Sequence, residues 1–400
     1  MPQVLPFQAF LPAPEFAPQV ILPEHLRFNA QKQAIELGNN PFSFGKILSA
    51  ANPEKSQEPQ SVLQCKRIFD QFLAEGIYRK QAQNAYYIYQ TQSQNHTQTG
   101  IVGCVQTADY NQNTIKKHEN TRTERRKQLS GFLGNLGINT TPVMLSYFKN
   151  KAIDDAVFTA TQATPTFSLQ HQTGIQIKLW VVADAATVAV IGRAFAAMPC
   201  LYIADGHHRA AVFSDLDAPQ FSVLLVPHNQ LAIHPFYRLI KNHEGFDLDE
   251  IMQKIEVNYH VKKCNLNQMY HQYLPNGNFL LCTRQETYQL KPKNTAATKP
   301  DSPSSALDNL DVSLLQNHIL SPCLGITNPS TDPRLGFGSR NIALPEFKHL
   351  LSRTDTACVF LCKAPSIEAV FGIADFGGIM PPKSTSFEPK VLSGLVLQQI

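Results

Sequence analysis

Residues 201–211 read Leu-Tyr-Ile-Ala-Asp-Gly-His-His-Arg-Ala-Ala, an apolar run that turns abruptly into a polar cluster. Residues 201–204 predict a short buried strand that ends at Asp205. Gly206 permits a tight turn, and a helix is expected to begin near His207. This junction gathers an aspartate, two histidines and an arginine directly after a buried strand.

Such a strand–helix junction favours an anion, because the backbone N–H groups in the first turn of a helix are free and carry partial positive charge. Gly206, His208 and Arg209 are the residues expected to bind phosphate here, since the Arg209 guanidinium can hold two phosphate oxygens. His207 and His208 are also candidates for proton transfer. A structural alternative stays open, in which Asp205 caps the helix and the histidines are solvated.

Two other segments carry candidate chemistry. Residues 116–121 place His118 beside Glu119, a carboxylate that can act as a general base or bind a metal, or they form an ordinary solvated helix start. Residues 383–390 hold lysines and hydroxyls that can grip phosphate, or they form an exposed polar turn. The phosphate-binding candidates in that segment are Lys383, Ser384, Thr385 and Lys390.

Several well-known motifs are missing from the sequence. Residues 383–390 lack the glycine frame of a Walker A loop. The chain also has no Gly-x-Gly-x-x-Gly, Gly-x-Ser-x-Gly or His-Glu-x-x-His, so dinucleotide oxidoreductases, α/β-hydrolases and zincins lose support.

Helical and strand patterns intermix along the chain, which predicts an α+β fold. The Pro-rich residues 1–25 are expected to run extended across another surface. Strands are predicted over 86–89, 100–105, 142–147, 176–182, 201–204, 221–226, 279–283, 286–290 and 357–362. Helices are predicted over 29–38, 61–83, 184–197, 248–255, 311–320 and 366–374.

Composition narrows the functional classes. The 400 residues include 35 Lys+Arg and 31 Asp+Glu, a net charge of +4, which gives no reason to expect nucleic-acid or membrane-surface binding. No apolar stretch is long enough to span a membrane, and the first Lys or Arg is Arg27, so a secretory signal is not expected. The eight cysteines show no Cys-x-x-Cys, which favours free thiols in the cytoplasm.

The spaced motifs of the chain resemble domain-of-unknown-function family 1015, over nearly the whole length. The resemblance is carried by segments around Pro6-Phe7, Asn40-Pro41, 115–121, 202–209, 310–316, 331–334 and 380–390. Asp332 and Arg334 become further candidates through it, beside His118. The family pattern has Tyr-Glu after His-His-Arg, where this chain has Ala210-Ala211. The family has no assigned activity to carry over.

The junction at 205–209 also resembles the phosphate-binding element of the ParB/sulfiredoxin-like superfamily. Sulfiredoxins have a reactive cysteine where His207 stands, so sulfinic-acid reduction is not expected. ParB-like free-serine kinases carry a similar Asp-Gly-His-x-Arg, which implies phosphoryl transfer to or from a small hydroxyl compound. On this resemblance the fold is expected to have three parts: a Pro-rich N-terminal part (1–84), a ParB/sulfiredoxin-like mixed-sheet core (85–245) and a C-terminal α+β part (246–400). The last part is expected to return its Lys383–Lys390 loop to the site in the core.

The leading hypothesis is an enzyme that moves a phosphoryl group between a nucleotide and a serine-like metabolite. Glu119 would take the proton of the acceptor hydroxyl, Asp205 would hold Mg²⁺, and Lys383 would neutralise the moving phosphoryl group. A phosphatase that uses His207 or His208 as acid, and a nucleotide or phosphometabolite sensor without turnover, are the alternatives. A ParB-like DNA-binding role finds no helix-turn-helix or basic stripe to support it. If one site is shared, His207, Glu119 and Lys383 should lie within one ligand length.

Overall fold

The computed structural model describes residues 1–22, 40–49, 59–93, 96–170, 174–272, 274–293, 303–339 and 341–400. Packing divides the chain into two units. Unit 1 comprises Met1–Leu231 and Pro389–Ile400, and unit 2 comprises Ala232–Glu388. The chain therefore leaves unit 1 once and returns to it for its C-terminal segment. The two packing units do not correspond to the three predicted parts. The division into three parts, with boundaries after residues 84 and 245, therefore stays a prediction.

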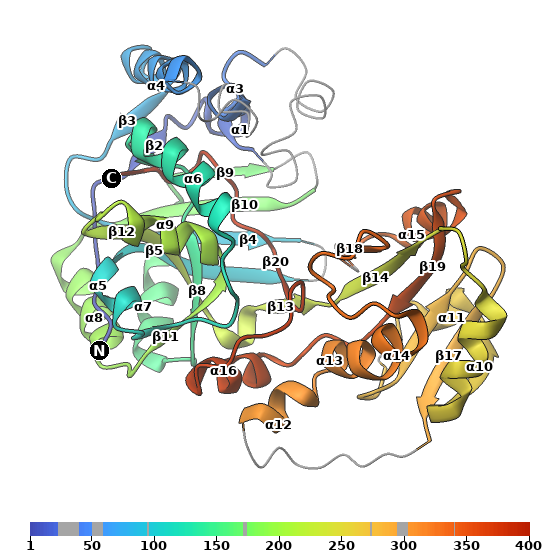
Figure 1. Cartoon of the computed structure of the whole chain (residues 1–400). Coiled ribbons are helices and arrows are strands. Elements are labelled where there is room, and N and C mark those ends of the chain that lie inside the picture. Colours follow the sequence, from blue (N-terminus) through green and yellow to red (C-terminus); the bar gives the residue numbers. More distant parts are fainter. Residues whose placement is uncertain are drawn as a thin grey trace. The chain divides into compact units, whose positions relative to one another are not determined.

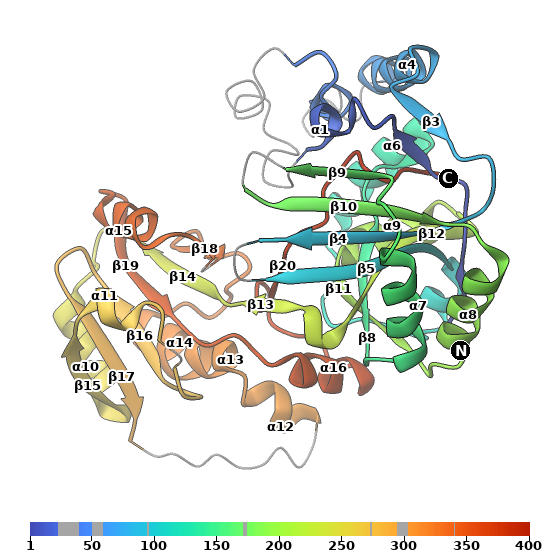
Figure 2. The same ribbon diagram turned by 180° about the vertical axis from the view of Figure 1, so that it is seen from behind.

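Nine strands of the described chain form one mixed sheet in unit 1. Its order is β6-β11-β8-β12-β5-β4-β10-β9, with β1 beside β5, and β9, β10, β4 and β5 are seen side by side in Figure 2. β11 runs parallel to β6 and β12 runs parallel to β8, while the other neighbours are antiparallel. The strands are β1 (Val4–Leu5), β4 (Tyr86–Gln92), β5 (Thr97–Gln106), β6 (Ile115–Lys116), β8 (Val143–Tyr147), β9 (Phe167–Gln170), β10 (Gln176–Val182), β11 (Leu201–Asp205) and β12 (Gln220–Pro227).

Helices surround this sheet (Figure 1). α7 packs on α8, where the Phe195 ring meets the Tyr147 ring of β8 edge-on at 5.1 Å. α6 packs on α9. The helices of unit 1 are α1 (Ala17–Val20), α3 (Gly45–Ser49), α4 (Pro59–Ala74), α5 (Thr107–Asn111), α6 (Thr123–Leu136), α7 (Lys151–Thr161), α8 (Ala185–Ala196), α9 (His207–Asp215) and the 3₁₀ turn η2 (His228–Gln230).

The two ends of the chain meet in unit 1. The Pro-rich N-terminal segment runs extended only in its first part, where β1 pairs with β5 and β2 (Phe10–Pro12) pairs with β3 (Tyr78–Lys80). The prediction of an extended chain was wrong for Ala17–Val20, which form α1, because Pro18 lies in the first turn of a helix, where a missing N–H is tolerated. The C-terminal segment lies beside it, because Phe10 and Leu22 form bridges to Leu397 and Ser393. Its last strand, β21 (Gln398–Gln399), pairs with β7 (Ile138–Asn139).

Unit 2 is built on a six-stranded antiparallel sheet within the described residues, in the order β15-β17-β16-β19-β14-β18. Phe347 of α15 packs with Leu280, Val359 and Leu361 in its core. The strands are β14 (Phe236–Lys241), β15 (Tyr259–Cys264), β16 (Phe279–Cys282), β17 (Thr287–Pro292), β18 (Leu335–Ser339) and β19 (Thr356–Leu361), with a separate pair of β13 (Ala232–His234) and β20 (Ser386–Glu388). The helices are α10 (Leu248–Asn258), α11 (Leu266–Met269), α12 (Pro303–Asp308), α13 (Asp311–Leu315), the π turn η3 (Gln316–Leu320), α14 (Ser321–Leu324), α15 (Leu344–Ser352) and α16 (Ile367–Asp375).

The α+β class is confirmed, and most predicted elements are present. The helix predicted over 61–83 was wrong beyond residue 74, because Gly76 takes a positive φ of 70° and ends α4, and β3 follows at Tyr78. The helix predicted over 29–38 lies outside the described residues. In the described part of the chain no helix is long and apolar enough to cross a membrane.

Candidate phosphate-binding site

The two motifs at 116–121 and 201–211 meet at one edge of the unit 1 sheet. β6 and β11 are parallel, with Ile115 opposite Leu201 and Lys116 opposite Tyr202. Parallel strands have their carboxyl ends at the same edge, so the residues that follow them emerge together. Nδ1 of His207 lies 3.6 Å from Oε2 of Glu119. The part of the shared-site prediction that concerns these two residues is therefore met.

Gly206 makes the tight turn between β11 and α9. Its φ of 100° is in the left-handed region, where an L side chain is strained. A Cβ at this position would also lie 2.9 Å from Nη2 of Arg209. The turn thus requires glycine for its backbone conformation and for the close approach of the guanidinium.

Arg209 is buried and holds this turn in place. Its Nη1 donates to the carbonyl oxygens of Thr141 and Pro142, both at 2.7 Å, and its Nη2 donates to Oδ2 of Asp205 at 3.0 Å. The residue is only 6% exposed. The open guanidinium fork expected from the sequence is therefore not presented by this side chain, whose donors stabilise the loop before β8 and the end of β11.

Asp205 lies between two cations. Its Oδ2 accepts from Arg209, and its Oδ1 accepts from Nζ of Lys390. Burial opposes ionisation, but the charges of Lys390 and Arg209 outweigh it and hold the pKa of Asp205 well below its usual value. Asp205 is therefore ionised at neutral pH, and it fixes the Lys390 ammonium, whose side chain is 24% exposed, beside the start of α9.

The arrangement around Asp205 does not fit the Mg²⁺ role predicted for it. Both carboxylate oxygens already contact cationic side chains, so a third cation there would meet two like charges. Within the described ranges, no group of three or more His, Cys, Asp or Glu side chains could hold a metal ion.

His207 is a buried, neutral imidazole. Burial is the main cause that lowers its pKa well below the usual value, and the charge of neighbouring His118 acts in the same direction. Nε2 of His207 accepts the backbone N–H of His118 at 3.4 Å, so the ring proton sits on Nδ1, facing Glu119. His207 thereby turns its Nδ1–H side toward the Glu119 carboxylate, whose side chain is 40% exposed.

His118 packs against His207, with the ring centroids 4.4 Å apart. Burial lowers the pKa of His118 from 6.5 to about 4, and the Asp205 charge opposes that shift only in part. Between these pH values the unfolded chain binds a proton here that the folded chain does not. The contribution of neutral His118 to the free energy of unfolding is thus fully present above pH 6.5. It falls as the pH drops toward 4, by about 1.4 kcal/mol per pH unit for one such group.

We expect that the His118→Gln variant takes up about one proton fewer on unfolding, so its free energy of unfolding depends less on pH in the acid range. The measurement is urea unfolding between about pH 7 and pH 4.5, followed by fluorescence of Trp180, the only tryptophan, which is buried in β10. The slope of the free energy of unfolding against pH is compared between the variant and wild-type protein. A loss of stability that is the same at every pH does not change this slope. An unchanged slope in the variant would contradict a neutral buried His118.

A second helix starts at the same place. The backbone N–H of Arg122, the residue before α6, donates to Nε2 of His208 at 3.0 Å. Neither α6 nor α9 has a side-chain cap, so both present backbone N–H groups and partial positive charge around His208. Lys117 and Arg125 lie in the same segment, and burial lowers the pKa of each. The local field therefore favours an anion.

The position of the α6 start beside His208 could not be predicted from the sequence. β6 has only two residues, so nothing in the local pattern marks it as the parallel neighbour of β11. The sequence of 116–121 indicates either a general base at Glu119 or an ordinary solvated helix start, and neither interpretation includes a second helix start beside α9.

Comparison with known proteins places the chain in a family. A family described as "Protein of unknown function (DUF1015)" matches residues 4–313. The chain is a DUF1015 protein. No curated protein matches it.

Three solved structures similar to this DUF1015 protein share 10–12% identity with it. A free serine kinase variant in complex with AMP has a TM-score of 0.39, covering 72% of this chain and 90% of that chain. SbnI with a C-terminal truncation, from Staphylococcus aureus, has a TM-score of 0.40, covering 74% and 86%. A conserved hypothetical protein from Pyrococcus furiosus has a TM-score of 0.35, covering 73% and 94%. The function of this DUF1015 protein must therefore be argued from its own residues.

The loop at 381–385 of this DUF1015 protein belongs to unit 2. Buried Arg238 holds it by donating to the carbonyl oxygens of Lys383 at 3.0 Å and Pro382 at 3.4 Å. The Ser384 hydroxyl is buried and donates to the Pro381 carbonyl at 2.6 Å, so it serves the loop itself. Lys383 is exposed and Thr385 is half-buried. The part predicted for these two residues in the phosphate site stays a prediction.

Asp332 and Arg334 form a clamp at a helix end in unit 2. The Arg334 guanidinium pairs with both carboxylate oxygens of Asp332 and donates to the Leu324 and Gly325 carbonyl oxygens at 3.1 Å. Those carbonyls belong to the C-terminus of α14. The two residues therefore have a structural role as a helix cap.

Proposed function

We propose that this protein is a phosphate-handling enzyme that transfers a phosphoryl group between a nucleotide and a small hydroxyl metabolite. One observation carries the proposal: a half-exposed carboxylate, Glu119, lies 3.6 Å from Nδ1 of neutral His207, next to the uncapped start of α9. A base, an anion-binding helix start and a lysine, Lys390, thus lie in one small region of unit 1. Such a combination is more typical of catalytic sites than of passive ones.

In the proposed reaction the nucleotide phosphates bind at the starts of α9 and α6, through backbone N–H groups and Lys390. Glu119 accepts the proton of the acceptor hydroxyl. The hydroxyl oxygen bonds to the terminal phosphorus, and the bond from that phosphorus to its bridging oxygen breaks. The nucleotide diphosphate leaves with the electron pair. The protein's part is positioning and charge stabilisation, which is what phosphoryl transfer mainly requires.

Two finer features belong to the same proposal. The 205–209 element would be a ParB/sulfiredoxin-like phosphate-binding element, and its resemblance to Asp-Gly-His-x-Arg of free-serine kinases favours a serine-like acceptor. Mg²⁺ would arrive with the nucleotide and neutralise its phosphates, because Mg²⁺ usually keeps water and phosphate ligands instead of an all-protein cage. Asp205 would position Lys390 and would not bind the ion.

The test of this site is Lys390→Met. The variant keeps the length of the side chain and removes the ammonium, and we expect affinity for ATP to fall by about 10- to 100-fold, the loss typical of one charge-assisted hydrogen bond. Calorimetric titration with ATP, ADP and CTP measures it, together with turnover in a pool of small hydroxy acids and amino acids. Lys149→Met, which removes an exposed lysine paired with Asp154, is the matched control.

The outcomes separate the candidate functions. Wild-type turnover that rises with hydroxyl compounds supports the transferase. Phosphate release without an acceptor indicates a phosphatase, and saturable binding without turnover indicates a sensor. If wild-type protein binds none of the three nucleotides, the nucleotide part of the proposal is wrong. Equal affinity for ATP in the Lys390 and Lys149 variants would show that Lys390 does not bind the nucleotide.

A further inference from the structure

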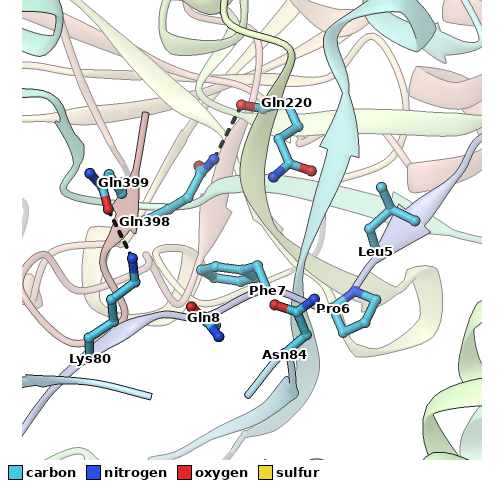
Figure 3. Close-up of a pocket in the computed structure, with 9 residues that line it drawn as sticks. All are labelled: Leu5, Pro6, Phe7, Gln8, Lys80, Asn84, Gln220, Gln398 and Gln399. Atoms are coloured by element: carbon cyan, nitrogen blue, oxygen red, sulfur yellow. Dashed lines mark hydrogen bonds between the residues drawn. The ribbon is translucent and has the colours of Figure 1, made fainter. Parts of the chain in front are cut away.

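A separate pocket of about 420 Å³ lies in unit 1 (Figure 3). None of Asp205, Glu119, His207 and Lys390 lines it. Its volume is in the range of small-molecule sites. Its polar lining consists of five side-chain amides and one lysine: Gln8, Lys80, Asn84, Gln220, Gln398 and Gln399. These residues come from well-separated parts of the chain, so the fold assembles them.

The pocket is held by hydrogen bonds to the surrounding strands. Oε1 of Gln398 accepts the Ser222 N–H at 2.6 Å, and its Nε2 donates to the Gln220 carbonyl at 3.2 Å (Figure 3). Nε2 of Gln8 donates to the Ala82 carbonyl at 3.0 Å. Because the Gln398 and Gln8 amides are fixed by the backbone, the part of the wall that they form is preformed, and a ligand would lose little free energy in ordering it.

Charge and hydrogen-bonding capacity define the class of ligand. Lys80 donates to Oε1 of Gln399 at 3.1 Å, a neutral acceptor, and none of the nine lining residues is Asp or Glu. Because Lys80 carries the one positive charge among these nine residues, the pocket favours a ligand with a single negative charge. Each side-chain amide offers both a donor and an acceptor, which is what a hydroxyl group also offers. Several amides side by side therefore suit several hydroxyls.

We infer that this pocket binds a small polyhydroxylated monoanion of the sugar-acid or hydroxy-acid class. Lys80 pairs with the carboxylate, and the amides of Gln8, Asn84, Gln220 and Gln399 take the hydroxyls. The inference goes beyond the proposed phosphoryl transfer, because the pocket shares no residue with that site.

The test is titration of the full chain with D-gluconate, followed by calorimetry and ligand-observed NMR. Sorbitol has the hydroxyls without the charge, and hexanoate has the charge without the hydroxyls. We expect gluconate to bind saturably and both comparison compounds to bind at least about 10-fold more weakly. Lys80→Gln should lower the affinity for gluconate by about 10-fold and leave the affinity for sorbitol unchanged. Lys151→Gln, which makes the same charge change on exposed α7, should have no effect.

Three results would overturn the inference: no gluconate binding, equal binding by wild-type protein and Lys80→Gln, or loss of gluconate binding in Lys390→Met. The last result would place gluconate at the candidate phosphate site. Failure of the ATP titration leaves the gluconate result intact, so the two proposals fail independently.

Discussion

Glu119→Gln is expected to lower the rate of phosphoryl transfer by about 100- to 10,000-fold, the usual contribution of a general base. The amide cannot accept the proton of the acceptor hydroxyl, but it has nearly the size and shape of the carboxylate, so the packing beside His207 is kept. Nucleotide affinity should stay within about 3-fold of wild type, because Glu119 is not among the groups that bind phosphate. The fall is therefore expected in kcat.

The matched control is Glu124→Gln, which makes the same change in the first turn of α6. Glu124 is exposed and pairs only loosely with Lys127, at 3.7 Å. Its variant should keep wild-type turnover. If Glu119→Gln keeps more than about half of the activity, another group is the base. If instead it abolishes nucleotide binding, the carboxylate shapes the pocket and does not act on the acceptor.

The core of the site could be predicted from the sequence because its signals are local. An apolar run, a glycine and a helix start lie within a few residues of each other, and the structure gives β11, the turn at Gly206 and α9 at those positions. The neighbourhood of Glu119 and His207 was expected on chemical grounds, since a base and an anion site need to share a substrate. The structure supplies the physical cause, the parallel pairing of β6 with β11.

The partners of each charged group could not be predicted. A sequence shows that Arg209 carries five donors, but it does not show that the Thr141 and Pro142 carbonyls come within 2.7 Å of them. Those contacts depend on how β8 enters the sheet, which is decided by long-range packing. The same holds for the amide-lined pocket, where Gln8, Gln220 and Gln399 have no shared spacing and come together only in the folded chain.

Arg209→Met is expected to destabilise unit 1 by about 3–5 kcal/mol. The side chain keeps most of its volume, but Asp205 loses one of its two cationic partners, and the Thr141 and Pro142 carbonyls lose their donor. Buried groups left without partners lose their hydration on folding and gain nothing in return, which is why breaking a buried pair costs far more than an exposed one. Urea unfolding followed by Trp180 fluorescence measures the change within unit 1.

Arg126→Met provides the comparison, because Arg126 pairs with Asp215 across α6 and α9 while its side chain is 37% exposed. Water replaces a lost partner there, so its loss should be about 1 kcal/mol or less. A second comparison is Asp205→Asn combined with Arg209→Met: the double variant should lose less than the sum of the single losses, because the two residues share one interaction. Equal losses of stability in the Arg209 and Arg126 variants would mean that Arg209 does not stabilise the turn. The guanidinium of Arg209 would then again be a candidate for binding phosphate.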